Sequence, residues 1–290
     1  MFNGSMAALI TPFRDGQIDV EAFERLVEFQ IANGTSVLVP CGSTGESATL
    51  THQEHVEIVR LSVSFAKGRV PVIAGTGSNS TQEAISLTRA AEQSGAAAAL
   101  LISPYYNKPT QEGIYRHYKA VADATRLPLI VYNIPGRTAS KIEATTLARL
   151  AEIERIIGIK EATGSLDETQ EVIRLCGDRI ELYCGDDSLT LPVLAVGGVG
   201  VISVVANVMP RQNAQLLAAC RAGDWSTARR LHYQLLPLIR ALFQETNPIG
   251  IKAALSMLGY CRDELRLPLL PMSDAPRAKL RAVMQQMGLL

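Results

Sequence analysis

The chain has 290 residues, 47% of them hydrophobic and 19% charged, which excludes a disordered protein and allows a large buried core. Its 28 basic residues balance 28 acidic ones, so no attraction to nucleic acid or to an anionic membrane is expected. Five scattered cysteines without a CxxC pair argue against a disulfide framework or a thiolate zinc site. We find no signal-peptide pattern and no apolar run near the ~18–20 residues of a membrane span, so a cytoplasmic protein is expected.

Eight short, β-rich apolar runs follow one another along the chain, and each is predicted to be a strand. Their residues alternate little, which indicates strands buried on both faces of a parallel sheet. The runs are Met6–Ile10, Ser36–Pro40, Val70–Gly75, Ala98–Ser103, Leu127–Asn133, Ile156–Glu161, Ile180–Gly185 and Val199–Val205.

Amphipathic stretches between these runs predict helices. Val20–Ala32 places Phe23, Leu26, Val27 and Ile31 on one face. Three further stretches have the same pattern: Thr81–Gln93, Gln111–Thr125 and Glu143–Ala151. Glycines are expected to end helices just before the next strand, at Gly34, Gly68 and Gly95.

After the eighth run the pattern is entirely helical, with helices expected over Pro210–Ala222, Trp225–Gln244, Ile249–Leu258 and Ala275–Met287. Eight uninterrupted strand–helix units, without a GxGxxG after the first strand, favour a closed (β/α)8 TIM barrel over an open doubly wound sheet. We predict a barrel over residues 1–224 and a C-terminal helical extension over residues 225–290, packed on the barrel or against another subunit.

In such barrels the catalytic groups lie where strands end. Lys160 ends the sixth predicted strand after a mostly apolar run, and desolvation there would supply the neutral amine that attacks a carbonyl. The alternative is a solvated lysine, or one paired with Glu161. Tyr132 ends the fifth strand, one repeat earlier, and its phenol could relay protons, although strand tyrosines are more often part of a core.

Two loops could bind carboxylates. Gly42–Glu46 (GSTGE) follows the second strand, and its backbone N–H groups and hydroxyls could hold an anion, unless it is an ordinary turn before a capped helix. Arg137, on the loop after Tyr132, suits bidentate binding of a second carboxylate, unless it is a solvated surface residue.

Other reactive residues predict no metal or cofactor site. Asp186 and Asp187 lack a third ligand and are expected to cap a turn, and Cys41 is expected to be a buried apolar residue. A zinc-dependent aldolase is not expected, because the four histidines do not form a cluster at strand ends; they are His52, His55, His117 and His232.

Four motifs together resemble the dihydrodipicolinate synthase family over essentially the whole chain: GSTGE at 42–46, YYNKP at 105–109, YNIPGRT at 132–138 and GIKEATG at 158–164. The first and last are shared with a wider superfamily of pyruvate-dependent lyases and aldolases. The arginine of YNIPGRT and the tyrosine Tyr106 of YYNKP point to the synthases. The resemblance implies condensation of pyruvate with L-aspartate 4-semialdehyde through a Schiff base on Lys160, in diaminopimelate and lysine biosynthesis.

The resemblance also implies roles for other residues. Tyr132, Ser43 and Tyr106 would relay protons, with Tyr106 supplied across a dimer interface of a homotetramer. Substrates would be held by Thr44, Arg137, Gly185 and the backbone of Ile202, with no metal or organic cofactor. Lysine would act as a feedback effector at the dimer interface, bound by Ser47, Ala48, His52, His55, Asn79, Glu83 and Tyr105.

One position departs from the family pattern. Ser43 stands where the synthases usually carry threonine, so the methyl group that restricts the side-chain rotamer is missing. N-acetylneuraminate lyases also carry GSTGE, so this lyase activity, or cleavage of a 2-keto-3-deoxy sugar acid, is the alternative activity. A non-catalytic barrel that only binds a keto acid or lysine is a third hypothesis, opposed by Lys160 and Tyr132.

Overall fold

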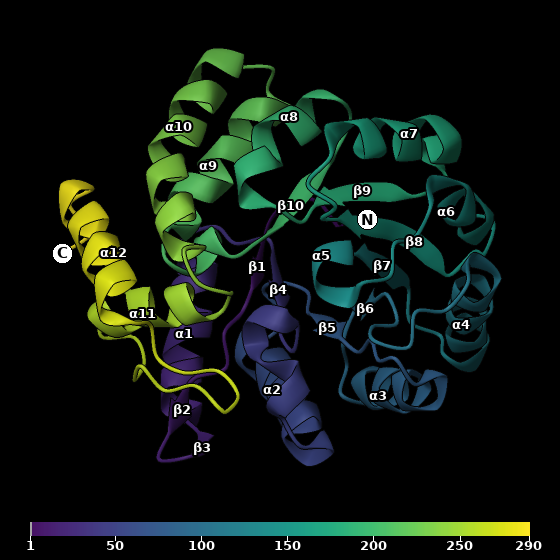
Figure 1. The fold of residues 1–290 in the computed structure, drawn as a ribbon, viewed down its shortest axis with the longest axis horizontal. Helices are drawn as coiled ribbons and strands as arrows, with labels where there is room; N and C mark the ends of the chain where they lie inside the picture. Colours follow the sequence, from purple (N-terminus) through teal and green to yellow (C-terminus); the bar gives the residue numbers. More distant parts are fainter. Residues whose placement is uncertain (1) are drawn as a thin grey trace.

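The computed structural model describes residues 2–290, and eight parallel strands enclose its centre (Figure 1). These strands are β1 (Gly4–Ala8), β4 (Val37–Val39), β5 (Ile73–Gly75), β6 (Ala98–Ile102), β7 (Leu129–Asn133), β8 (Ile156–Glu161), β9 (Glu181–Cys184) and β10 (Gly200–Ser203). They hydrogen-bond in the order β4-β1-β10-β9-β8-β7-β6-β5. A parallel bridge between Leu38 and Val72 joins the two ends of this order, which closes the ring and confirms the predicted TIM barrel.

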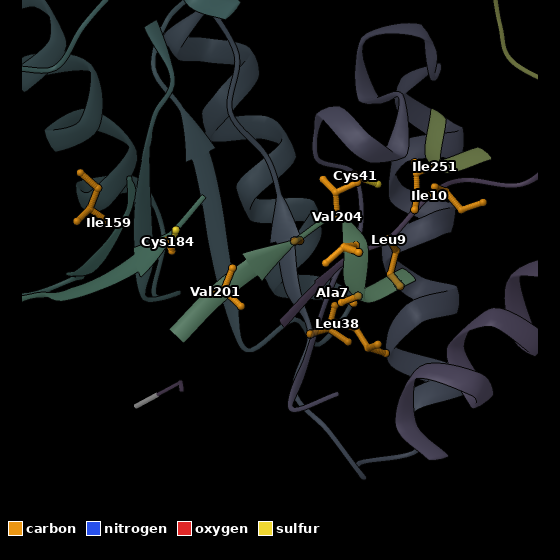
Figure 2. Packing of buried hydrophobic residues seen from close by; sticks show 14 of the residues in the cluster. Ala7, Leu9, Ile10, Leu38, Cys41, Ile159, Cys184, Val201, Val204 and Ile251 are labelled. Carbon is orange, nitrogen blue, oxygen red and sulfur yellow. The ribbon is translucent and has the colours of Figure 1, made fainter. Parts of the chain in front are cut away.

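The strands are buried on both faces, as the absence of alternation predicted. Side chains that fill the barrel interior include Met6, Val39, Leu100, Ile130 and Ile202. The alternate positions pack outward under the helices, among them Ala7, Leu38, Ile159 and Val201, which Figure 2 shows within the outer cluster. This two-sided burial holds the strand ends firmly, so residues placed there keep a fixed geometry.

Helices cover the outside of the barrel. Those between strands are α1 (Val20–Ala32), α2 (His52–Ala66), α3 (Thr81–Gln93), α4 (Gln111–Ala124), α5 (Pro135–Thr138), α6 (Ala144–Leu150), α7 (Leu166–Cys176) and α8 (Thr190–Ala195). Several begin at a side-chain cap; Thr51 and Glu54 form a reciprocal capping box at the start of α2. The three glycines predicted to end helices all have positive φ, namely Gly34, Gly68 and Gly95.

Some predicted boundaries were wrong by a few residues. The first strand begins at Gly4 and ends at Ala8 rather than running to Ile10. The last strand ends at Ser203, because the N–H groups of Val204 and Val205 donate to the carboxylate of Asp187 instead of to a neighbouring strand. Sequence analysis also missed a small hairpin, formed by β2 (Phe13–Arg14) and β3 (Gln17–Ile18).

The C-terminal part of the chain consists of helices, as predicted: α9 (Pro210–Arg221), α10 (Trp225–Leu242), α11 (Ile249–Met257) and α12 (Asp274–Gln286). Figure 1 shows α10, α11 and α12 together on one side of the barrel. Ile251 of α11 belongs to the same hydrophobic cluster as Ile10 and Cys41 (Figure 2). Residues of the predicted extension therefore share the core of the barrel.

Candidate active site

A cavity of about 430 Å³ opens at the carboxyl ends of the strands. Its walls come from the loop after β4, from the ends of β5, β6 and β7, and from two C-terminal segments, 246–248 and 268–269. Strand-end loops are where TIM barrels carry their chemistry. The C-terminal contribution was not foreseen from the sequence.

Lys160, on β8, is not part of the cavity lining but lies against Tyr132, which is, and 6% of its surface is exposed. Burial lowers the pKa of its ammonium to about 8, assisted by the charge of Arg137 and opposed by the buried carboxylate of Asp187. At that pKa a substantial fraction of the side chain is the neutral amine near neutral pH. The solvated or Glu161-paired lysine considered above is not what the structure contains, because Glu161 hydrogen-bonds to Asn133 and Thr163 instead.

Tyr132 is the partner of Lys160 in the register between β7 and β8. The ammonium nitrogen lies 4.2 Å from the centre of the Tyr132 ring, which itself lines the cavity. Burial raises the pKa of the Tyr132 phenol to about 12, although Arg137 and a hydrogen bond with Ser43 oppose the shift. The phenol is therefore protonated at neutral pH and adjoins both an amine and a hydroxyl.

Gly185 follows β9 directly and allows a close approach to Lys160. A Cβ atom at this position would lie 3.1 Å from Cε of Lys160 and 2.7 Å from Cβ of Ala162. Its N–H donates to the carbonyl of Glu161 at 2.7 Å, which fixes the backbone there. A larger residue here would force Ala162 to shift and would crowd the Lys160 side chain.

The GSTGE turn also lines the cavity, through Gly42, Ser43 and Glu46. Ser43–Gly45 is one turn of 3₁₀ helix. Glu46, directly after this turn, and Cys41, two residues before it, both have positive φ, of 54° and 57°. The hydroxyl of Thr11 donates to the carbonyl of Gly45 at 2.7 Å. Left-handed residues other than glycine persist only where surrounding contacts fix them.

Asn247 joins this turn to the arginine loop, and sequence analysis missed it. Its side-chain amide donates to the Thr44 hydroxyl at 3.0 Å. Its backbone carbonyl accepts a hydrogen bond from the Arg137 guanidinium at 2.8 Å. Both Thr44 and Asn247 are buried, and Arg137 lines the cavity. An Asn-Pro pair between two helical segments was the only signal in the sequence, and it indicates a turn rather than a site.

Two other predicted site residues, Ile202 and Tyr106, differ in their exposure to solvent. Ile202, on β10, is buried and its side chain fills the barrel interior, so only its backbone could face a ligand. Tyr106 is 87% exposed and has a left-handed φ of 72°. It does not line the cavity of its own chain, unlike its neighbour Tyr105.

Six of the seven residues predicted to bind an effector line the same cavity: Ser47, Ala48, His52, His55, Glu83 and Tyr105. Nε2 of His52 lies 2.7 Å from the Glu83 carboxylate, which also accepts from the Ser78 hydroxyl, and both contacts lower the pKa of Glu83. The seventh residue, Asn79, accepts a hydrogen bond from Asn107 through its carbonyl.

The acidic pair after β9 caps backbone groups, as predicted. Asp186 accepts from the N–H of Ser188 at 2.9 Å, and Asp187 accepts from Val204 and Val205 at 2.9 and 2.8 Å. Within residues 2–290 no three acidic, histidine or cysteine side chains are grouped so that they could hold a metal ion. In the same part of the chain, no helix has the length and apolar character needed to cross a membrane.

Comparison with known proteins agrees with this geometry. The model of the dihydrodipicolinate synthetase family matches residues 1–287. The chain belongs to that family. The 4-hydroxy-tetrahydrodipicolinate synthase of Pelobacter propionicus is 54% identical to it, over all of both chains.

Two solved structures are also similar over nearly the whole chain. A chloride-inhibited dihydrodipicolinate synthase from Acinetobacter baumannii, complexed with pyruvate, is 43% identical with a TM-score of 0.98 and full coverage of both chains. A dihydrodipicolinate synthase from Cyanidioschyzon merolae with lysine bound is 40% identical with a TM-score of 0.97, covering 100% of this chain and 99% of that one. As a member of this family the chain is an enzyme of the lyase class.

Proposed function

We propose that the enzyme condenses pyruvate with L-aspartate 4-semialdehyde to give 4-hydroxy-tetrahydrodipicolinate, through a Schiff base on Lys160. The observation that carries the proposal is a buried lysine, with its pKa lowered to about 8, beside the ring of Tyr132 at the carboxyl ends of two paired strands. A neutral amine in a site shielded from water is the nucleophile that imine formation requires. The name of the Pelobacter relative supports the choice of substrates.

In the proposed reaction, the neutral amine of Lys160 attacks the keto carbon of pyruvate, and the carbinolamine loses water to give a protonated imine. Loss of a proton from the methyl carbon gives an enamine, which attacks the aldehyde carbon of the semialdehyde. The amino group of the new adduct then attacks the imine carbon, closes the ring and releases Lys160. Each stage moves a proton, and we assign these transfers to the phenol of Tyr132, which burial keeps protonated at neutral pH, together with the Ser43 hydroxyl.

We assign Thr44 and the backbone of Ile202 to pyruvate and Arg137 to the carboxylate of the semialdehyde, and we expect Gly185 to leave room for substrate beside Lys160. A hydroxyl already fixed by Asn247 and a guanidinium on the cavity wall are suitable groups for carboxylates. Serine at position 43 keeps the relay hydroxyl. Loss of the usual methyl group is offset in part by the contacts that hold the turn, since Thr11 binds the carbonyl of Gly45.

We infer that Tyr106 completes the relay in a second copy of the chain. A tyrosine that is 87% exposed and held in a left-handed conformation is unusual unless something covers it. Assembly into a dimer, and of two dimers into a tetramer, would place this side chain over the neighbouring cavity. The proposed dimer interface would then contain the effector residues around Tyr105.

Lysine is the proposed feedback effector of this interface. The Glu83 carboxylate would pair with an ammonium group, and Tyr105 would donate to the effector's carboxylate. The lysine-bound relative supports this assignment. Glu83→Ala should relieve inhibition by lysine, whereas Glu57→Ala, which removes an exposed carboxylate from α2, should not. If saturating lysine leaves the unaltered enzyme unaffected, this part of the proposal is wrong.

The experiment that tests the main proposal has two parts. Borohydride reduction in the presence of pyruvate should add one pyruvate-derived mass to Lys160, located by peptide mass spectrometry. Turnover should then require both pyruvate and the semialdehyde, and should survive treatment with EDTA. An adduct on a different lysine, or turnover of sugar acids instead of the semialdehyde, would contradict it.

A further inference from the structure

A second buried lysine lies close to the active site but outside the chemistry proposed above. Lys252, on α11, forms an ion pair with Glu46, the last residue of the GSTGE turn, and the two side chains are 0% and 1% exposed. Lys252 does not line the cavity. The two residues are more than two hundred positions apart in the sequence, so the pair joins the C-terminal helices to the wall of the active site.

Glu46 needs such a contact because of its backbone. Its φ and ψ of 54° and 37° are left-handed, and it ends the 3₁₀ turn that carries Ser43 and Thr44. Its N–H donates to the carbonyl of Ser43 at 3.2 Å, and its carbonyl accepts from the N–H of Thr49 at 3.0 Å. A change in this conformation would move the hydroxyls of Ser43 and Thr44, since only Gly45 separates Glu46 from Thr44 in the turn.

The carboxylate of Glu46 is held entirely by C-terminal groups. One oxygen pairs with the ammonium of Lys252, and the other accepts from the backbone N–H of Arg266 at 3.1 Å. Lys252 is fixed in turn: it donates to the carbonyl of Glu264 at 2.7 Å and lies 4.1 Å from the ring centre of Phe13. The position of the pair is therefore determined from several directions.

A pair of this kind contributes more to geometry than to stability. Moving two charges out of water is costly, and burial does lower the pKa of Lys252 although Glu46 opposes the shift. Apolar residues of the same size would often stabilise a core as well or better. They could not, however, fix the direction of the Glu46 side chain and with it the left-handed turn.

We propose that Lys252 is a positioning residue for the condensation: through Glu46 it holds the turn that places Thr44 where the carboxylate of the 2-keto acid binds. The inference rests on the proposed function and adds a residue to it. It predicts that loss of the pair weakens the binding of pyruvate while the reactivity of Lys160 is largely retained.

The test uses the double variant Glu46→Gln/Lys252→Met, which removes both charges together and leaves no unpaired charge in the core. Trapping by borohydride is measured against pyruvate concentration, with the melting temperature as the measure of folding. The half-saturating pyruvate concentration should rise about tenfold, as expected for a misplaced carboxylate contact, while trapping at saturation changes less than about threefold.

A matched control is available on the surface. Asp15 and Arg262 also join the N-terminal part of the barrel to the C-terminal segment, at 2.7 Å, but both are exposed and far from the GSTGE turn in sequence. Asp15→Asn/Arg262→Met should leave the pyruvate dependence unchanged. If the half-saturating pyruvate concentration also rises in this control variant, any contact with the C-terminal segment matters, and the specific role of Lys252 is overturned.

The remaining outcomes also decide the matter. A folded double variant with unaltered pyruvate dependence would overturn the proposal. If the double variant does not fold, Lys252→Arg replaces it, since it keeps the charge but displaces it; a rise in half-saturating pyruvate supports positioning, and an unchanged value refutes it. Loss of folding in both would make Lys252 a stability residue only. Failure of the unaltered enzyme to trap pyruvate would instead refute the proposed function.

Discussion

The two walls of the active-site cavity are built by different means. The strand wall consists of Tyr132 and the adjoining Lys160, which lie on adjacent strands and are brought together by the register of the sheet alone. The other wall, the turn wall, is the GSTGE turn. Thr44 and Glu46 stand on a turn that is held by Asn247 and Lys252, about two hundred residues away, through individual side-chain contacts. The strand wall follows from the fold and would survive many substitutions around it. The turn wall depends on particular residues, and single changes should disturb it.

The largest effect should come from the strand wall. Lys160→Arg should reduce turnover by at least about a thousandfold and abolish pyruvate trapping, because a guanidinium stays protonated and cannot form the imine. Lys141→Arg, at an exposed lysine paired with Glu168, is the control and should behave as the unaltered enzyme. Substantial pyruvate trapping in Lys160→Arg would show that a different residue is the nucleophile, and that the strand wall does not carry the reactive amine.

Arg137 lines the cavity and donates a hydrogen bond to the backbone carbonyl of Asn247. Arg137→Ala should lower kcat/KM for the semialdehyde about ten- to a hundredfold, the effect of losing a charge-assisted contact of ~1.5–3 kcal/mol. Pyruvate trapping should change much less. Arg149→Ala, which removes a surface ion pair with Glu112, is the control. Equal damage to both substrates would mean that Arg137 supports the structure of the cavity rather than one substrate.

Asn247→Ala tests the turn wall directly. It removes the hydrogen bond to Thr44 but keeps the backbone carbonyl that binds Arg137. A single buried hydrogen bond is typically worth about 1 kcal/mol, so half-saturating pyruvate should rise about fivefold. Asn33→Ala, which also loses one side-chain hydrogen bond but at the end of α1, should have no such effect. An unchanged pyruvate dependence would leave Thr44 independent of the C-terminal segment.

An effect of similar size is expected from pH alone. Because the pKa of Lys160 is lowered to about 8, the neutral fraction rises about fivefold between pH 7 and 8 and then levels off. The initial rate of pyruvate trapping should follow this curve. An ordinary lysine would instead give a tenfold rise per pH unit that continues to about pH 10. A tenfold rise per pH unit would show that burial in the strand wall does not lower the pKa of the Lys160 amine.

These differences explain what the sequence could predict. Short apolar runs predicted the eight strands, and the strand ends predicted Lys160 and Tyr132, because periodicity and strand order are local properties of the chain. The role of Asn247 and the pairing of Lys252 with Glu46 could not be predicted, since nothing near either residue specifies a partner so distant. The boundary at residue 225 stays a prediction, although Ile251 lies in the barrel's own core. The effects assigned to Tyr106 depend on a second copy of the chain, which no pattern within one chain describes.

The burial of Cys41 bears on the selectivity of this enzyme toward its substrates. The residue lines the cavity, so in the proposed reaction its thiol would lie beside a keto acid and an aldehyde, both of which thiolates attack readily. Burial raises the pKa of Cys41 well above its ordinary value, and Cys184, near Lys160, is raised to about 12. Thiolate, the nucleophilic form, is therefore scarce at both positions. In the proposed reaction, the amine of Lys160 would therefore meet the incoming carbonyl with little thiolate nearby to compete for it.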